Sequence, residues 1–424
     1  MQRRVFLKSG ALALVTIGLS PRFLRRAALL AETHAAARGK VLICLFQRGA
    51  ADALNVLVPH GDPFYYALRP SIAIARPARG VDGAAIDLDG FFGLHPALAP
   101  LAPLYARGML APVHAVGSPS STRSHFDAQD FMETATPDVK STHDGWLNRL
   151  LAASDATANA RLASATHPAA LRGVALAAQA PRAFDGPLPT VALRSLDELR
   201  IRANGADASR LEQLYTAAGA DLVHGAGAEA FEAIRALRAA DPDQYTAANG
   251  AEYPSSEFGR RLRQIAQLVK ADVGMEIAFA DVGGWDTHVN QGAATGQLAS
   301  RLDDFARSIA ALVTDLGDRM DDVVILTMSE FGRMARENGN RGTDHGHAGA
   351  LFLIGGQVKG GKVYGRWPGL AAEQLYEGRD LALTTDFRSV FAEVATRHMG
   401  ASRLDAVLPG YTAPEAAWLG AVRS

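Results

Sequence analysis

Four uninterrupted apolar runs end abruptly in polar residues, and this pattern constrains the fold more than any other feature of the sequence. The runs cover residues 40–46, 110–116, 275–280 and 323–328. Apolar runs of this length without alternation are typical of parallel strands that are buried on both faces of a sheet. Helical periodicity separates them and is clearest over residues 258–271 and 297–316. The sequence therefore predicts an α/β fold with a mostly parallel central sheet.

Each of these runs leads into polar side chains that could bind a ligand or take part in catalysis. In chain order these are Asp52, then Ser124 and His125, then Asp286 and His288, and finally Glu330 and Arg333. Open α/β sheets bind ligands beyond the carboxyl ends of their strands. We therefore expect these side chains to share one site.

Asp286 and His288 are two positions apart, and in an extended segment such residues project to the same side. One carboxylate and one imidazole would then converge as ligands of a divalent metal ion. The alternative is a simple hydrogen-bonded loop.

A second polar cluster, residues 342–350, contains Asp344, His345 and His347 and leads into the apolar run 351–354. Polar side chains directly before a buried strand are costly to desolvate unless they bind something or each other, so all three are candidate metal ligands. In an extended segment His345 and His347 would share a side while Asp344 faces away, although the glycines allow a turn that relaxes this limit. The alternative is one histidine bonded to a carbonyl group and one exposed.

Glu330 and Arg333 follow one of the strongest strand signals in the chain. Glu330 is well placed as a metal ligand in the shared cleft. Arg333 has a planar guanidinium that either holds an anionic substrate or forms a plain salt bridge with Glu330. Asp52 is a further candidate ligand, or else a turn aspartate that Asn55 could replace.

Ser124 directly precedes a helical stretch over residues 125–133, where backbone N–H groups favour an anion. Ser124 is therefore a candidate nucleophile, with His125 or Asp127 beside it. The alternative is that Ser124 only caps the helix and Asp127 closes a capping box.

Residues 1–37 have the features of a twin-arginine signal peptide. Arg3 and Arg4 form the basic pair, residues 11–19 are apolar, and residues 35–37 are alanines suited to signal peptidase. We expect export by the twin-arginine machinery to the periplasm or beyond and no stable transmembrane segment in the mature chain. The alternative is an uncleaved N-terminal anchor. The twin-arginine route carries folded proteins, often with a metal or cofactor already bound.

The composition is that of a globular protein in one large domain or two. Of the formal net charge of −1, residues 1–37 contribute six basic and one acidic side chain, so the remainder carries −6 and lacks the basic surface that nucleic acid would require. Cys44 is the single cysteine, and its position in an apolar run indicates inert packing. Residues 155–250, rich in Ala and Arg, are expected to form a helical insertion or cap, with helices near 209–218 and 228–239. The alternative is that they join the main sheet.

These motifs together resemble an exported bacterial family of unknown function within the alkaline phosphatase and sulfatase superfamily. The resemblance covers nearly the whole mature chain, 38–424, and rests on residues 47–55, 124–130, 284–288, 329–333 and 343–347 and on the glycine pairs 355–356 and 360–361. It implies a three-layer α/β/α fold like that of alkaline phosphatase. It also implies one or two divalent metal ions and a nucleophile at a helix start.

Carried over by position, the resemblance implies five metal-binding positions and one nucleophile. The ligands would be Asp52, Asp286, His288, Glu330 and either His345 or His347, and the nucleophile would be Ser124. The superfamily commonly has Asp-His where this chain has Glu330-Phe331, and Asp and His four apart where Asp286 and His288 are two apart. A sulfatase-type Cys or Ser with its Pro-x-Arg neighbourhood is missing, which argues against an ordinary sulfatase.

The sequence thus favours a periplasmic, metal-dependent hydrolase of phosphate or sulfate esters carried by a small molecule or a glycan. Carboxylate and imidazole ligands indicate Zn, Mn or Ca. The rival hypothesis is an exported binding or assembly protein that retains the fold and performs no turnover.

Overall fold

An eight-stranded sheet forms the centre of the protein in a computed structural model that describes residues 39–154, 169–196, 245–412 and 414–423. The strand order is β11-β5-β10-β9-β1-β8-β6-β7. Their bounds are β1 Val41–Arg48, β5 Leu110–Gly117, β6 Gly173–Leu176, β7 Val191–Leu193, β8 Ile277–Gly283, β9 Val323–Met328, β10 Gly349–Gly355 and β11 Thr385–Asp386. Only β10 runs against the other strands, since it pairs antiparallel with both β5 and β9. The predicted mostly parallel sheet is confirmed.

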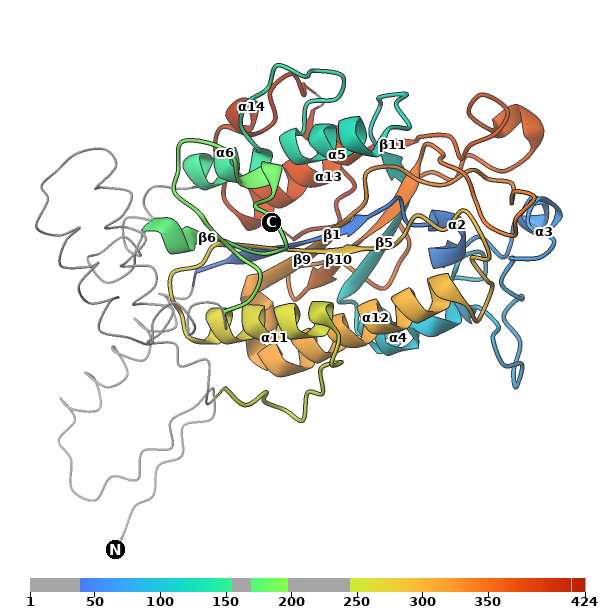
Figure 1. Cartoon of the computed structure of the whole chain (residues 1–424), viewed down its shortest axis with the longest axis horizontal. Coiled ribbons are helices and arrows are strands. Elements are labelled where there is room, and N and C mark those ends of the chain that lie inside the picture. The colour runs from blue at the N-terminus through green and yellow to red at the C-terminus, as the bar shows by residue number, and fades with distance from the viewer. Residues whose placement is uncertain (1–38, 155–168, 197–244, 413, 424) are drawn as a thin grey trace, which may run out of the picture. The chain divides into compact units, whose positions relative to one another are not determined.

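Helices cover both faces of this sheet, which gives three layers (Figure 1). One face carries α4 Ala102–Ala106, α11 Glu257–Lys270 and α12 Gln297–Leu316, and the other carries α5 His125–Thr134, α6 Trp146–Ala153, α13 Phe387–Glu393 and α14 Leu404–Val407. The periodicities in the sequence predicted α5, α11 and α12 to within one residue at each end.

A smaller sheet of order β2-β4-β3 lies outside the main one. It consists of β2 Leu57–Val58, β3 Ile86–Asp87 and β4 Gly93–Leu94, and the short helices α2 Ala53–Val56 and α3 Pro63–Leu68 belong to the same part of the chain. These elements extend the polypeptide beyond the end of β1.

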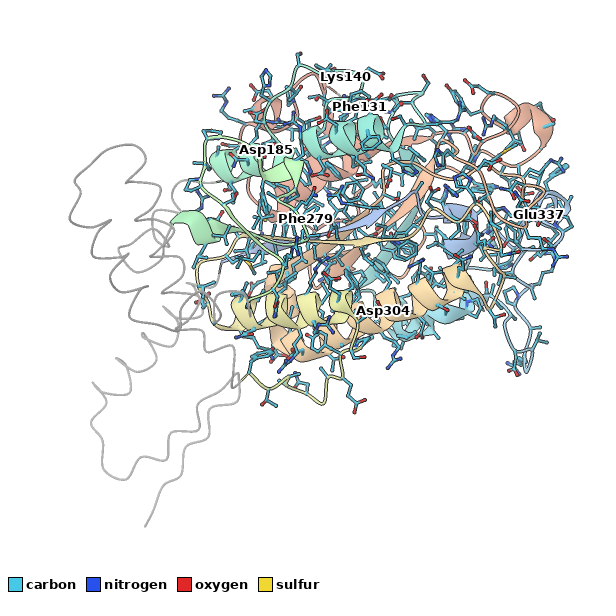
Figure 2. The ribbon with its side chains drawn as sticks, in the orientation of Figure 1. Phe131, Lys140, Asp185, Phe279, Asp304 and Glu337 are labelled. Carbon is cyan, nitrogen blue, oxygen red and sulfur yellow. The ribbon has the colours of Figure 1, made fainter. Side chains whose placement is uncertain are left out.

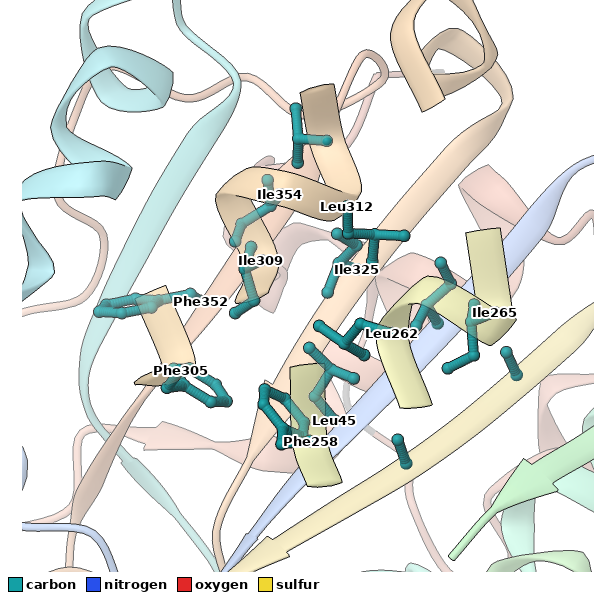
Figure 3. Packing of buried hydrophobic residues seen from close by; sticks show 14 of the residues in the cluster. Leu45, Phe258, Leu262, Ile265, Phe305, Ile309, Leu312, Ile325, Phe352 and Ile354 are labelled. Carbon is teal, nitrogen blue, oxygen red and sulfur yellow. The ribbon is translucent and has the colours of Figure 1, made fainter. Parts of the chain in front are cut away.

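Side chains of the central strands alternate between two hydrophobic cores, one on each face of the sheet. Ile43 and Leu45 of β1 pack in the same core as Phe258 of α11 and Phe305 of α12 (Figure 3). Leu42 and Phe46 contribute to the core beneath the opposite helices. Each such side chain stabilises the fold by about 1.5–3 kcal/mol when fully buried. Figure 2 shows the side chains on both faces of the sheet, with Phe279 of β8 in the interior and Lys140 at the outer edge.

Cys44 lies on β1 within the second core and is completely buried. Burial raises the pKa of its thiol well above the ordinary value. The thiol therefore stays protonated and serves as packing, as the sequence predicted.

The region expected to be a helical insertion contains strands. Residues 173–193 add β6 and β7 to the edge of the main sheet, where β6 pairs parallel with β8. The helical prediction is therefore wrong for this part of residues 155–250, and the alternative that it joins the sheet is correct. The predicted helices near 209–218 and 228–239 lie outside the described residues, as does the predicted leader. Among the residues described, no helix has the length and apolar character needed to cross a membrane.

His398 ties the helical layer to the sheet. It ends the helical turn Val394–His398, and its Nε2 atom donates a hydrogen bond of 2.9 Å to the carbonyl oxygen of Val41. Its Nδ1 atom has no hydrogen-bond partner among the described residues. Burial lowers the pKa of His398 from 6.5 to about 4, so the imidazole is neutral in the folded protein.

This depressed pKa predicts that acid destabilises the fold between pH 6.5 and about pH 4. In that window the unfolded chain binds a proton at His398 that the folded chain does not, so the free energy of unfolding falls as pH falls, by up to about 1.4 kcal/mol per pH unit. His398→Gln keeps an N–H donor for Val41 but cannot titrate. Urea unfolding across this window should give the variant a shallower pH dependence than the parent. Equal slopes would contradict the assignment.

Candidate metal centre

Two loops and the first residue of a helix bring three imidazoles and one carboxylate together at the carboxyl ends of the parallel strands. Asp286 and His288 follow β8, His125 is the first residue of α5, and His345 precedes β10. One ligand atom from each of His125, Asp286 and His345 lies within 4.8 Å of the others. His288 joins them through its contacts with Asp286 and His345.

The distances between these atoms fit a tetrahedral ion. His345 Nε2 lies 3.0 Å from His125 Nε2 and 3.1 Å from His288 Nε2. Asp286 Oδ1 lies 2.9 Å from His288 Nε2 and 3.2 Å from His345 Nε2, and Asp286 Oδ2 lies 3.5 Å from His125 Nε2. Ligands held about 2.0–2.1 Å from a tetrahedral zinc ion lie about 3.3–3.4 Å from one another. The ligand atoms of His125, Asp286 and His345 therefore have the spacing of a metal site, and His288 lies beside Asp286 and His345.

The second nitrogen of each imidazole is fixed by an oxygen that can only accept. His125 Nδ1 lies 2.7 Å from Glu330 Oε1, His288 Nδ1 lies 3.0 Å from Asp344 Oδ1, and His345 Nδ1 lies 2.9 Å from the carbonyl oxygen of Arg123. Each Nδ1 must therefore carry the hydrogen, and in the neutral ring each Nε2 presents a lone pair. Lone pairs that face each other at 3.0–3.1 Å repel unless a cation lies between them.

The charged groups around these rings carry a net negative charge, which favours a cation. Burial acts to raise the pKa of Asp286 and of Glu330, but hydrogen bonds from Arg333 and from His125 respectively outweigh it, and both pKa values are lowered. The pKa of Asp344 is lowered chiefly by its hydrogen bond from Asn338. Three carboxylates and the Arg333 guanidinium leave two net negative charges, which one divalent ion would neutralise.

Local anchors hold the loop that follows β8. Trp285 is fully buried, its Nε1 donates to the carbonyl oxygen of Val282 at 2.9 Å, and its ring packs edge-on against Phe305. Gly49, at the end of β1, has φ +119°, and a Cβ there would lie 2.8 Å from the Asp286 nitrogen. Only glycine permits this close approach. Its own N–H donates to Glu330 Oε1 at 2.8 Å, so the same residue supports both loops.

Glu330 was expected to be a metal ligand, but it lies behind His125. Its Oε1 atom accepts hydrogen bonds from Gly49 N, from His125 Nδ1 and from Gln129 Nε2, and its side chain has no exposed surface. A carboxylate so fully engaged orients the imidazole that faces the cluster, in the manner of outer-sphere partners of metal-binding histidines. Glu330 is therefore not a ligand of the cluster, as was expected, but holds the imidazole of His125 in place.

Arg333 was expected to pair with Glu330 or to hold a substrate, and the structure shows that it does not pair with Glu330. Its Nη1 donates to Asp286 Oδ1 at 2.6 Å, while Nε and Nη2 donate to Thr343 Oγ1 and the Thr343 carbonyl oxygen. Its side chain is completely buried. Arg333 therefore holds Asp286 in place and keeps that carboxylate ionised.

Asp52 lies outside the cluster, contrary to expectation. Its two oxygens accept from Nη1 and Nη2 of Arg69 at 2.6 and 2.9 Å, and Oδ2 also accepts from Gln291 Nε2 at 2.6 Å. Both side chains of the ion pair are fully buried. A guanidinium already satisfies this carboxylate, so Asp52 has no oxygen free for a metal ion. Asn55 Oδ1 accepts a hydrogen bond from the same arginine, so Asn55 does not replace Asp52 as a metal ligand.

The segment before β10 bends, which separates its polar residues. His345 enters the cluster, Asp344 accepts from His288, and the His347 ring stacks on Tyr376 with centroids 4.3 Å apart. Gly346 permits the bend because a Cβ there would lie 2.3 Å from the backbone of Arg333. The turn that the glycines were expected to allow is therefore present, and of the two histidines His345 lies at this cluster and His347 does not.

Ser124 precedes α5 and is exposed, and it makes no side-chain capping hydrogen bond. Asp127 pairs with Lys140 at 2.8 Å instead of closing a capping box. The capping alternative is therefore wrong. The role of Ser124 as nucleophile stays a prediction, supported by its place next to His125.

Several residues that organise the site were not singled out from the sequence. They are Arg69, Gln129, Gln291, Asn338 and Thr343. Gln129 could have been found, because it lies four residues after His125 and so on the same face of α5. The other four lie outside the regular elements, where no periodicity marks them.

A family model described as "Protein of unknown function (DUF1501)" matches residues 109–409. No protein of curated function matches the sequence significantly.

Three solved structures are similar at low sequence identity. The lipoteichoic acid synthase LtaP from Listeria monocytogenes is 10% identical over 75% of this chain and 66% of its own, with a TM-score of 0.32. The PsFucS1 sulfatase from Pseudoalteromonas sp. is 14% identical over 81% and 68%, with a TM-score of 0.33. The C-terminal periplasmic domain of EcEptC from Escherichia coli, a complex with Zn, is 10% identical over 75% and 74%, with a TM-score of 0.31.

The geometry predicts one tightly bound divalent metal ion per chain and a clear difference between two neighbouring histidines. His345→Ala should lose the ion because Nε2 of His345 faces the cluster, whereas His347→Ala should retain it because that ring stacks on Tyr376. Elemental analysis after dialysis against a weak chelator measures both variants. Two ions in the parent protein, or equal loss in both variants, would contradict the assignment.

Proposed function

The chain belongs to the family described as Protein of unknown function (DUF1501), and from that premise we propose that it is an exported hydrolase of phosphate or sulfate esters that uses one divalent metal ion. The observation that carries this proposal is the convergence of three imidazole Nε2 atoms on the carboxylate of Asp286. The fixed Nδ1 partners leave a lone pair on each of those three atoms in the neutral state, which is what a metal ion requires.

Zinc is the ion that this set of atoms fits best. Nitrogen ligands suit zinc, whereas calcium takes six to eight oxygen ligands. The spacing of 2.9–3.2 Å among the neighbouring atoms is also close to that of a small tetrahedral ion. Of the ions that the sequence indicated, calcium is therefore disfavoured.

The surrounding residues would prepare the site for ester hydrolysis. A bound divalent ion supplies Lewis-acid chemistry, because it polarises an ester oxygen and makes a water ligand more acidic. Glu330 and Asp344 hold the rings of His125 and His288, and Arg333 holds Asp286. The side chains of Asp286 and His288 are 40% and 39% exposed, so a substrate can reach the cluster from solvent.

One observation favours the rival proposal of a binding protein without turnover. With His288 as a fourth ligand beside His125, Asp286 and His345, the site would have the four protein ligands that are typical of structural zinc sites, whereas catalytic sites keep one position open. The exposure of Asp286 and His288 argues the other way, since structural sites are usually closed. Measured turnover decides between the two proposals.

We expect the zinc-loaded protein to hydrolyse at least one member of a panel of phosphate monoesters, phosphate diesters and sulfate esters, and Ser124→Ala to abolish that activity. Ser124 makes no capping bond, so the substitution should leave stability and zinc content unchanged. Ser121→Ala, which removes another exposed hydroxyl from the same loop, is the matched control.

Two other results are informative. Full activity of Ser124→Ala would assign the attack to another group or to a water molecule. A zinc-loaded parent protein that is inactive throughout the panel would favour the binding protein.

We also propose that residues 1–37 direct export through the twin-arginine machinery, because Arg3 and Arg4 precede a short apolar run. Replacing both arginines with lysine keeps the charge and removes the recognised pair. The doubly substituted precursor should accumulate in the cytoplasm, as cell fractionation would show. Normal recovery outside the cytoplasm would contradict this route.

A further inference from the structure

A tight turn over residues 376–380 lies against the segment that carries His345. Its two ends, Tyr376 and Asp380, pair with each other through backbone hydrogen bonds of 2.9 and 3.0 Å. From this turn, Arg379 Nη2 donates a hydrogen bond of 2.9 Å to the carbonyl oxygen of His345. The turn is therefore in direct contact with one of the residues of the candidate metal centre.

Asp380 is the buried carboxylate of this turn, and it pairs with two guanidinium groups. Its side chain has no exposed surface. Oδ2 accepts from Nε and Nη2 of Arg123 at 3.1 and 2.6 Å, and Oδ1 forms an ion pair of 3.1 Å with Nε of Arg379. Two guanidinium groups held this close to each other repel unless an anion lies between them. Asp380 is the anion that keeps both arginines in place.

These two arginines contact His345 at different atoms. The carbonyl oxygen of Arg123 accepts from His345 Nδ1 at 2.9 Å, and this contact leaves Nε2 of the ring to face the cluster. Arg379 holds the His345 carbonyl oxygen instead. One contact thus orients the imidazole and the other fixes its backbone, and a single carboxylate connects the two arginines that make them.

We infer that Asp380 is a positioning residue of the candidate metal centre and that it acts on His345 through Arg123 and Arg379. This inference rests on the proposed metal-dependent function and adds to it a residue that does not touch the ion. Outer partners of metal-binding histidines typically change metal affinity by about 10–100-fold when they are replaced. Because Asp380 acts through two arginines, we expect the lower end of that range.

Zinc titration of the metal-free full chain, in competition with a chromophoric chelator, tests this inference. Asp380→Asn keeps the shape of the side chain but removes its charge and turns an amide N–H group toward a guanidinium. Zinc affinity should therefore fall about tenfold. Glu377→Gln is the matched control, because Glu377 pairs with the same Arg123 at 2.6 Å but is 49% exposed. Exposed ion pairs contribute little, so this variant should keep the zinc affinity of the parent protein.

A double-mutant cycle separates positioning from a general loss of stability. His345→Ala is titrated to zinc concentrations that fill its weakened site. If Asp380 acts through His345, adding Asp380→Asn to this variant should cause no further loss of zinc affinity. Asp315→Asn removes a different buried carboxylate, which pairs with Lys270 and accepts from Tyr245. It should lower stability without changing zinc affinity.

Arg379→Gln keeps the test decisive if Asp380→Asn does not fold. Arg379 is partly exposed, and the substitution removes the donor to the His345 carbonyl oxygen, so zinc affinity should again fall. Unchanged zinc affinity in the variants that fold, or an equal loss from Asp380→Asn with and without His345, would overturn the inference and leave the metal centre standing. A parent protein that binds no zinc would remove the proposed function itself.

Discussion

Three hydrogen bonds made by imidazole Nδ1 atoms determine what the candidate metal centre can do. Glu330, Asp344 and the Arg123 carbonyl oxygen accept them, and this leaves Nε2 as the free nitrogen of each ring. The acceptors are not equivalent. The hydrogen bond to Glu330 raises the pKa of His125, whereas burial lowers the pKa of His345. A proton and a metal ion therefore compete chiefly at His125, the ring with the strongest acceptor behind it.

A buried chain of polar side chains links Asp52 to Asp286. Arg69 bonds Asp52, Asp52 accepts from Gln291, Gln291 accepts from Thr343, and Thr343 accepts from Arg333, which binds Asp286. Removing one partner of a buried ion pair costs about 3–5 kcal/mol, so this chain holds the loop after β8 firmly. Because Arg69 already neutralises Asp52, that carboxylate adds no uncompensated negative charge to the site.

The sequence predicted the layers of the fold and the convergence of the motifs. It did not predict which residues face the cluster and which hold the cluster's side chains in place. Apolar runs and helical periods specify buried strands and helices directly, so α12 was predicted over its observed length. The spacing of Asp286 and His288 likewise placed two side chains together. Whether a carboxylate such as Glu330 faces an ion or supports a ring depends on distant partners, here Gly49 and Gln129. Local sequence does not encode those contacts.

The reversed direction of β10 completes the site. Motifs that follow parallel strands reach the carboxyl edge of the sheet, whereas a motif that precedes a parallel strand would lie at the opposite edge. His345 precedes β10, and only because β10 pairs antiparallel with β5 and β9 does its ring lie 3.0 Å from Nε2 of His125. A single reversed strand thus allows a loop before a strand and loops after strands to supply ligands to the same point.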